Sequence, residues 1–402
     1  MDTVRPSHWE PHIRKLAVLA GSTMVILVAN FYLGDPGQRL QTDWTAFDNA
    51  ADRLLAGERI YVPWGQDEPL PYLYAPFALW LSLPLAGAGF FASWMISFAL
   101  TALTSALGIG FLVKSTPKAV DKTTGLIVAA TGGSFFGAAV LGQYSGMYVL
   151  SLGLALWLWT KDRHFLAGLA LGILWLKPNF AIAIPVVLIW SRSWPALRGF
   201  LSSAVLAFVA SLPFGLHLWS EAYFNVQDMG QRQVDGQLFE SKFVSVLGGF
   251  QALTGAELLE PASLVVFFVV ALVVGIATLI VWHPKHLVGN FDRAFGVLAV
   301  FVVVANTRVY FYDGAVAVFG VLALWFYSRR THDRASSRWI AILALPLWIA
   351  SWGNAFEFLN AYFGVFAAAI ALVVARNALR ESTSDSPEVG TRRDDIAHVA
   401  HV

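Results

Sequence analysis

The sequence contains no cysteine and few charged residues. None of its 402 residues is Cys, and Asp, Glu, Lys and Arg together make up 13%. The absence of cysteine excludes disulfides and thiol chemistry. A soluble globular chain carries about 25% charged residues, so this chain cannot cover a water-facing surface. Its net charge of +1 implies no strongly acidic or basic partner, and it has no nucleic-acid-binding signature.

Several motifs of catalytic chemistry are missing as well. There is no Gly-rich phosphate cradle, no P-loop lysine and no nucleophile elbow. His283 and His286 are three residues apart, but they flank Pro284 in a short polar loop, and we interpret them as loop residues. No metal-ligand spacing appears elsewhere, so the sequence implies no metal or cofactor.

Apolar residues are abundant and form long uncharged blocks. They make up 57% of the chain, and the mean hydropathy is +0.61. Blocks such as Leu264–Trp282 approach the roughly 20 residues that cross the hydrocarbon core as a helix. The blocks are continuous rather than alternating, which argues against a β-barrel. The sequence therefore predicts an all-α, polytopic membrane protein.

Basic residues indicate the topology. The apolar run 16–33 follows Arg5, Arg14 and Lys15 and exceeds the roughly 7–15 residues of a signal-peptide core, so we expect an uncleaved first helix. Placing the later basic loops in the cytoplasm predicts about twelve spans in the plasma (inner) membrane, with both termini on the cytoplasmic side. The predicted spans are residues 14–33, 90–113, 123–140, 144–160, 164–176, 179–191, 198–215, 262–282, 291–306, 309–328, 338–352 and 356–376.

One apolar segment is left outside these spans. Leu70–Ala86 contains three prolines, which favours a re-entrant or interfacial segment. If it crossed the membrane, the chain would have thirteen spans and the basic loop Lys114–Lys122 would lie outside, so we prefer twelve.

The topology predicts a single membrane domain, residues 1–380, with two large outer loops at about 34–89 and 216–261. Residues 381–402 are rich in Ser, Asp and Arg and are expected to form a disordered cytoplasmic tail.

The first outer loop contains a predicted helix, Trp44–Ala56, which Gly57 ends. Asp43 stands where an N-cap is expected, and that is the simpler interpretation of this residue. The alternative is a catalytic acid.

The same helix has an apolar and a polar side. Phe47, Leu54 and Leu55 give it a stripe that suits a membrane surface. Asp48 and Asp52, with the neighbouring Arg53, are interpreted as a solvated face.

Two basic residues on the predicted outer side depart from the positive-inside rule. Lys177 lies between two apolar segments beside Asn179, and Arg308 precedes Tyr310 and Asp313. Lys177 either snorkels to the interface or binds an anion such as a lipid phosphate. Asp313, about one turn into a predicted helix, is costly at that depth unless it is paired. An ion pair with Lys177 or Arg308 is one interpretation, and a functional role is the other.

The outer face therefore combines a potential base, Asp43, with two cations, Lys177 and Arg308. The tight outer turn at Gln143 and Tyr144 is on the same side. Because that face has no access to ATP, an enzyme there needs a pre-activated donor, and a lipid phosphate-sugar fits.

The order of these motifs resembles glycosyltransferase family 87. Each motif is weak alone, but together they are fairly specific and cover roughly residues 40–320. They are Asp43–Trp44 with Phe47, Leu54–Gly57 with Tyr61, Tyr74–Pro76, Leu83–Leu85, Gly142–Ser145, Ala167–Gly172, Leu176–Pro178, Trp194–Gly199 and Tyr310–Asp313.

The resemblance implies a GT-C fold with extracytoplasmic loop helices and an inverting transfer of a sugar, often mannose, from a polyprenyl phosphate to a lipid or glycan. It implies that Asp43 matches the family's catalytic acid. Lys177 and Arg308 would hold the donor phosphate, and Gln143, Tyr144, Asn179, Tyr310 and Asp313 would bind substrate or orient the cations. The mannosyltransferase branch often has a histidine near Phe311–Asp313, and this departure leaves the acceptor and the sugar open.

Two other classes fit the twelve-span pattern. A secondary transporter usually shows two related halves and charges near the membrane midplane, whereas this chain shows neither. A non-catalytic partner in envelope assembly would tolerate the loss of Asp43.

The predicted topology can be tested by thiol labelling, because the chain has no cysteine of its own. We expect Asp43→Cys in intact cells to react with a membrane-impermeant maleimide, and Lys285→Cys to react only after permeabilisation. Labelling of position 43 from the cytoplasmic side alone would contradict the topology.

Overall fold

The computed structural model describes residues 10–33, 43–62, 72–117, 120–234, 261–306, 309, 312–331, 334–350 and 357–384. Every regular element within these ranges is a helix, which confirms the all-α prediction. Arg308 and Tyr310, both predicted site residues, lie outside the described residues. So does the predicted tail from residue 385 onward, whereas residues 381–384 belong to the last helix rather than to a tail.

The helices follow the predicted segments in order. They are α1 (Glu10–Leu33), α5 (Phe90–Ser115), α6 (Thr123–Ala130) with α7 (Gly133–Leu141), α8 (Ser145–Trp159), α9 (His164–Leu171) with η3 (Gly172–Leu176), α10 (Pro178–Ala181) with α11 (Ala183–Trp190), α12 (Trp194–Ser211), α15 (Pro261–Val281), α17 (Phe291–Val304), α18 (Gly314–Arg330), α19 (Arg334–Ala350) and α20 (Glu357–Ser384). Between them lie α3 (Trp44–Ala56), α4 (Leu79–Ser82), α13 (His217–Val234) and α16 (Pro284–Leu287).

Fewer helices than predicted are long and apolar enough to cross a membrane by themselves. Among the described residues there are three, Phe90–Ser115, Trp194–Phe214 and Pro261–Val281. A fourth is possible if α6 and α7, bent by 41°, form one span. Several other apolar segments, such as Ser145–Trp159, form helices of only 10–17 residues. The helices are therefore confirmed, and the number twelve stays a prediction.

The described part of Leu70–Ala86 forms only short helical turns. Two 3₁₀ turns, Pro76–Ala78 and Leu83–Leu85, flank the single α-helical turn α4. The ten residues of Pro76–Leu85 extend about 15 Å at 1.5 Å per residue, which is roughly half of the hydrocarbon thickness. This length agrees with the prediction that the segment does not span.

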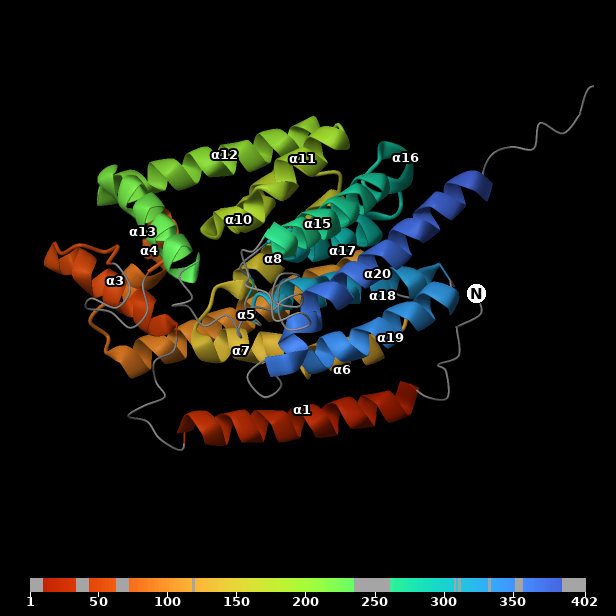
Figure 1. Ribbon diagram of the computed structural model, residues 1–402, viewed down its shortest axis with the longest axis horizontal. Helices are drawn as coiled ribbons and strands as arrows, with labels where there is room; N and C mark the ends of the chain where they lie inside the picture. The colour runs from red at the N-terminus through yellow and green to blue at the C-terminus, as the bar shows by residue number, and fades with distance from the viewer. Residues whose placement is uncertain are drawn as a thin grey trace, which may run out of the picture.

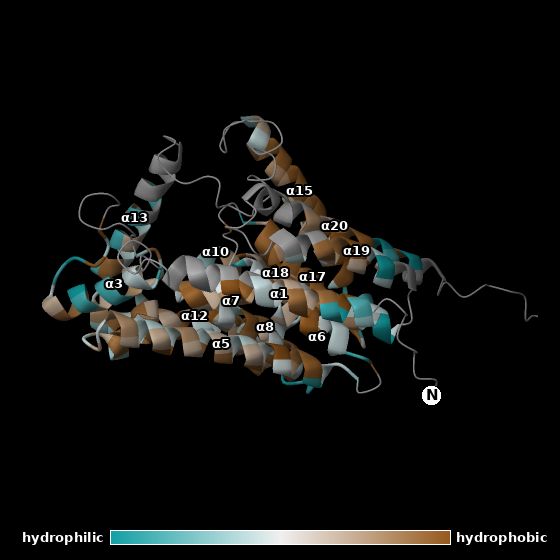
Figure 2. Ribbon diagram, turned by 90° about the horizontal axis from the view of Figure 1, so that it is seen from below, coloured by the Kyte–Doolittle hydropathy of each residue, from teal (hydrophilic) through white to brown (hydrophobic). Residues whose placement is uncertain are grey.

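The helices form an elongated bundle with polar ends. In Figure 1, α3, α4 and α13 gather at one end, and α16 lies at the other with the C-terminal part of α20. Figure 2 shows hydrophilic residues on α3 and near the far ends of α19 and α20, with hydrophobic residues between them. The predicted outer-loop helices thus share one end of the bundle.

Glycines allow the closest helix contacts. A Cβ at Gly108 of α5 would lie 2.4 Å from the Val149 carbonyl oxygen of α8, and one at Gly153 would lie 2.1 Å from the Gly108 carbonyl oxygen. Small residues in this arrangement let backbones pack directly, the usual means of helix association in lipid. The α5–α8 contact therefore has no room for side chains at these positions.

Glycines also allow α9 and α12 to pack closely. A Cβ at Gly168 would lie 1.9 Å from the Ala196 carbonyl oxygen, and one at Gly199 would lie 2.0 Å from the Phe165 carbonyl oxygen. A Cβ at Gly172 would lie 1.8 Å from the hydroxyl oxygen of Ser203. Glycines from two of the sequence motifs, Ala167–Gly172 and Trp194–Gly199, thus have a packing role.

Two glycines of α5 provide a matched test of this packing. We expect Gly108→Ala to destabilise the protein by about 1–3 kcal/mol, because the added methyl group has to push α8 away. Gly110→Ala should be neutral or stabilising, because a Cβ there meets nothing within 4 Å and alanine favours helix. Thermal unfolding in detergent would measure both, and equal unfolding temperatures for the two variants would contradict this account.

Candidate active site

Helix α3 forms as predicted, but Asp43 does not cap it. Gly57 ends the helix in the left-handed region at φ 70°. Asp43 has helical backbone angles (φ −57°, ψ −18°) and its side chain makes no cap hydrogen bond. A side-chain cap needs an extended residue at this position, so the N-cap interpretation is wrong.

The predicted apolar stripe of α3 divides between core and surface. Phe47 is buried, whereas Leu55 is 66% exposed. The predicted solvated face is partly wrong: Asp52 is exposed and Asp48 is half-buried. Asp48 accepts a hydrogen bond from the Ser93 hydroxyl at 3.0 Å, and burial raises its pKa.

The carboxylate of Asp43 meets Gln143, one hundred residues away. The amide nitrogen of Gln143 donates to Oδ2 of Asp43 at 2.5 Å. Gln143 lies on the turn between α7 and α8, where the preceding Gly142 adopts φ 71° and a Cβ would lie 2.7 Å from the Cβ of Trp44. Only glycine fits both this backbone and this contact. The turn is therefore pressed against the start of α3.

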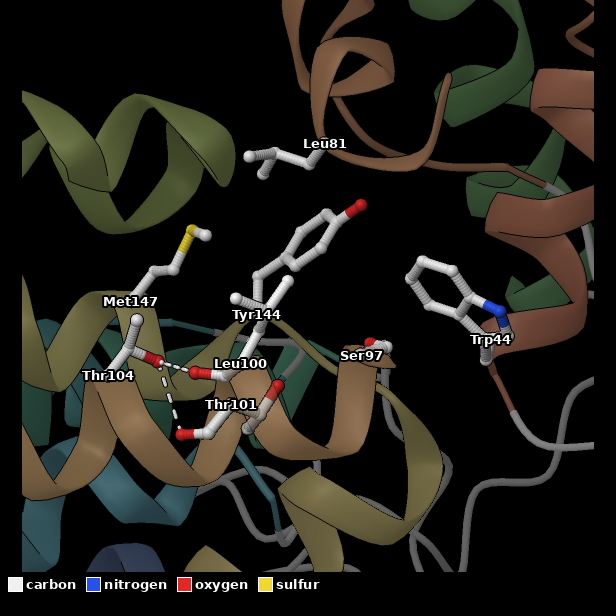
Figure 3. Close-up of a pocket in the computed structure, with 8 residues that line it drawn as sticks. All are labelled: Trp44, Leu81, Ser97, Leu100, Thr101, Thr104, Tyr144 and Met147. Carbon is white, nitrogen blue, oxygen red and sulfur yellow. Dashed lines mark hydrogen bonds between the residues drawn. The ribbon is translucent and has the colours of Figure 1, made fainter. Parts of the chain in front are cut away.

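Helix α5 holds this turn through two side-chain hydroxyl groups. The hydroxyl of Ser97 donates to the carbonyl of Gly142 at 3.3 Å, and that of Thr101 donates to the carbonyl of Gln143 at 2.9 Å. Both residues line the pocket of Figure 3 together with Trp44, Tyr144 and Met147. Because these hydroxyls donate to backbone carbonyls, they hold the turn in place.

Tyr74 connects this turn to the first outer loop. Its hydroxyl donates to the side-chain oxygen of Gln143 at 2.5 Å. Its ring packs against Phe47 and Tyr144, with centroids 4.8 and 5.3 Å away. Burial raises the pKa of Tyr74 well above its usual value, and nearby carboxylates, Asp313 and Asp43, add to this rise. The Tyr74 hydroxyl therefore stays protonated and can donate a hydrogen bond.

The predicted cation Lys177 forms an ion pair with Asp313. Its ammonium group contacts Oδ2 of Asp313, which is fully buried and directly precedes α18 instead of lying one turn inside it. The ammonium also lies over the rings of Phe180 at 4.9 Å and Tyr312 at 6.0 Å. Asn179 donates to the side-chain oxygen of Asn306 at 2.9 Å. The ion-pair interpretation of Asp313 is confirmed.

Two tyrosines join these parts into one site. Tyr144 and Tyr148 lie one turn apart at the start of α8. The ring of Tyr144 packs against Tyr74, which donates to Gln143. The ring of Tyr148 packs on Phe180 with centroids 5.4 Å apart. The structure thus brings Asp43, Gln143, Tyr144, Lys177 and Asp313 together from distant parts of the chain.

Tyr74 and Tyr148 are site residues that the sequence prediction did not include. Tyr74 stands in the Tyr74–Pro76 motif, which was the only available signal, and Tyr148 resembles any aromatic residue of an apolar helix.

The two predicted outer loops contact each other. Arg59 pairs with Glu221 of α13 at 3.7 Å, and the Asn225 amide donates to the Tyr72 carbonyl at 3.0 Å. Within the described ranges, no group of three His, Asp or Glu side chains is placed to hold a metal ion.

Comparison with known proteins identifies the family. The model of glycosyltransferase family 87 matches residues 72–307, which is more than half of the 402-residue chain. No curated protein and no solved structure matches the sequence. The matched segment includes Tyr74, Gln143 and Lys177. The chain is therefore a membrane protein that belongs to glycosyltransferase family 87.

Proposed function

We propose that this glycosyltransferase moves a sugar, mannose in the first instance, from a polyprenyl phosphate to a lipid or glycan acceptor on the extracytoplasmic face of the plasma membrane. The observation that carries the proposal is the site itself. A half-buried carboxylate, Asp43, and a paired cation, Lys177, are linked through one cluster of packed aromatic side chains, Tyr74, Tyr144, Tyr148 and Phe180.

Asp43 acts as the general base in this proposal. As the acceptor hydroxyl attacks the anomeric carbon, its proton passes to the carboxylate of Asp43. The new bond from the acceptor oxygen to carbon forms while the bond from carbon to the phosphate oxygen breaks, and the polyprenyl phosphate leaves with the electron pair. Attack opposite the leaving group inverts the anomeric centre.

Lys177 stabilises the leaving phosphate. An ammonium group has three donors, and the ion pair with Asp313 holds it in place without using all of them. Positive charge aimed at the departing phosphate lowers the barrier most in a water-poor site. Arg308 supplies a second cation in this proposal. Tyr144, Asn179 and Tyr310 contact the sugar, and Asp313 orients Lys177.

The topology that goes with this function has about twelve spans, with both termini in the cytoplasm. The three or four membrane-capable helices support a membrane location. The placement of α3 and α13 at one end of the bundle supports a site built from outer loops. The scheme needs no metal, because the cations carry the charge stabilisation.

Replacing the proposed base gives the direct test. We expect Asp43→Asn to lower the rate of mannose transfer from polyprenyl-phosphate mannose by about 10²–10⁴-fold, the usual contribution of a general base, without loss of folding. Asp52→Asn, an exposed carboxylate on the same helix, serves as the matched control and should keep full activity. A folded Asp43→Asn variant as active as the native chain would overturn the assignment.

A second test separates phosphate binding from a purely structural ion pair. Lys177→Met alone would leave Asp313 buried without its cation, which destabilises the fold. The double change Lys177→Met with Asp313→Asn replaces both charges. We expect it to fold but to bind polyprenyl phosphate about tenfold more weakly than Asp313→Asn alone, which keeps the cation.

Binding would be measured as competitive inhibition of transfer or by direct titration with the polyprenyl phosphate. Unchanged affinity in the double variant would restrict Lys177 to a structural role.

A further inference from the structure

Gln143 is held at both ends of its side-chain amide. Its nitrogen donates to Asp43 and its oxygen accepts from Tyr74, each at 2.5 Å. The residue is only 3% exposed. Both ends of this buried amide are therefore engaged by protein groups.

The structure gives both bonds a direction. The Tyr74 hydroxyl donates to the side-chain oxygen of Gln143, and the amide nitrogen donates to Asp43. An ionised carboxylate only accepts hydrogen bonds, whereas a protonated one also carries a donor. The arrangement therefore favours the ionised form of Asp43, the form that a general base needs.

Tyr74 and Gln143 are each held in place by further contacts. The carbonyl of Tyr74 accepts from the Tyr61 hydroxyl at 2.8 Å, and its ring packs against Phe47. The carbonyl of Gln143 is held by Thr101. The orientation is thus built into the loop and the turn before any substrate binds.

We propose that Tyr74 and Gln143 are positioning residues that orient the Asp43 carboxylate and keep it ionised through the chain Tyr74–Gln143–Asp43. This inference rests on the proposed function, because it assigns the chain a role in general-base catalysis.

Other titratable groups lie near Tyr74, Gln143 and Asp43, and they stay unchanged in the test. Tyr144 and Tyr148 lie against Tyr74, and Asp313 acts on it from the Lys177 pair. Asp48, one turn further along α3, is hydrogen-bonded to Ser93. None of these groups is changed in the variants below.

The experiment measures mannose transfer by the purified full-length chain across a pH series, with polyprenyl-phosphate mannose as the donor. We expect Gln143→Met to move the acidic limb of kcat/KM upward by about one pH unit, because the carboxylate loses a hydrogen-bond donor. Gln143→Glu should move it further, because a second carboxyl group disfavours ionisation of the pair.

Tyr74→Phe keeps the ring and removes only the hydroxyl. We expect kcat to fall about tenfold with little change in KM, because the amide loses its fixed orientation. Combined with Gln143→Met, it should add almost nothing, since the chain is already broken. Tyr223→Phe, at an exposed tyrosine of α13, is the matched control and should leave the pH profile unchanged.

A second readout does not depend on activity. Infrared difference spectra between each variant and its Asp43→Asn counterpart report the protonation of Asp43 directly. An upward shift of that titration in Gln143→Met supports the inference whether or not the donor is the right one. An unshifted titration, or fully additive losses in the double variant, overturns it. Absence of transfer by the native chain, with a shifted titration, would instead overturn the proposed function.

Discussion

The close approach of Gly142 to Trp44 is the contact on which the site depends. A Cβ at Gly142 would stand 2.7 Å from that of Trp44, so the turn between α7 and α8 can press directly against the first residue of α3. Asp43 and Gln143 are the neighbours of these two residues in sequence, and the contact brings their side chains into hydrogen-bonding distance. Helix α5 completes the arrangement, because Ser97 and Thr101 hold the turn by its carbonyls. Backbone packing thus sets the position of the carboxylate.

Burial imposes a second constraint on the site. An isolated charge in a low-dielectric interior is costly, so it must be paired or hydrogen-bonded. Asp313 is fully buried and has Lys177 as its partner. Asp43, which is only half-buried, is held by a neutral amide. The two carboxylates therefore suit different tasks. Asp313 is paired with a cation, whereas Asp43 accepts a hydrogen bond from the Gln143 amide.

Local patterns in the sequence predicted local structure well. Residues 44–56 form the predicted helix with Gly57 at its end, and the apolar segments are helical with similar bounds. Contacts between distant segments were less accessible. Spacing alone favoured Asp43 as a helix cap, because the residue type and position fit and the competing partner lies one hundred residues away. More spans were predicted than meet the length criterion, because predicted segments such as 164–176 and 179–191 form apolar helices of only 10–17 residues. The Lys177–Asp313 pair was predicted as one of two choices, since charge complementarity in an apolar chain leaves few partners.

The extent of the family match clarifies how the site is assembled. The match covers residues 72–307 and so includes Tyr74, Gln143 and Lys177, but neither Asp43 nor Asp313. Each carboxylate outside the match is bound by a side chain inside it: Asp43 by Gln143, and Asp313 by Lys177. A general base without a fixed partner would be poorly oriented, and a buried aspartate without a cation would be unstable. The matched segment therefore provides the partners that place both carboxylates. The start of α3 and the start of α18 are therefore in direct contact with the matched core, although the family model does not extend to them.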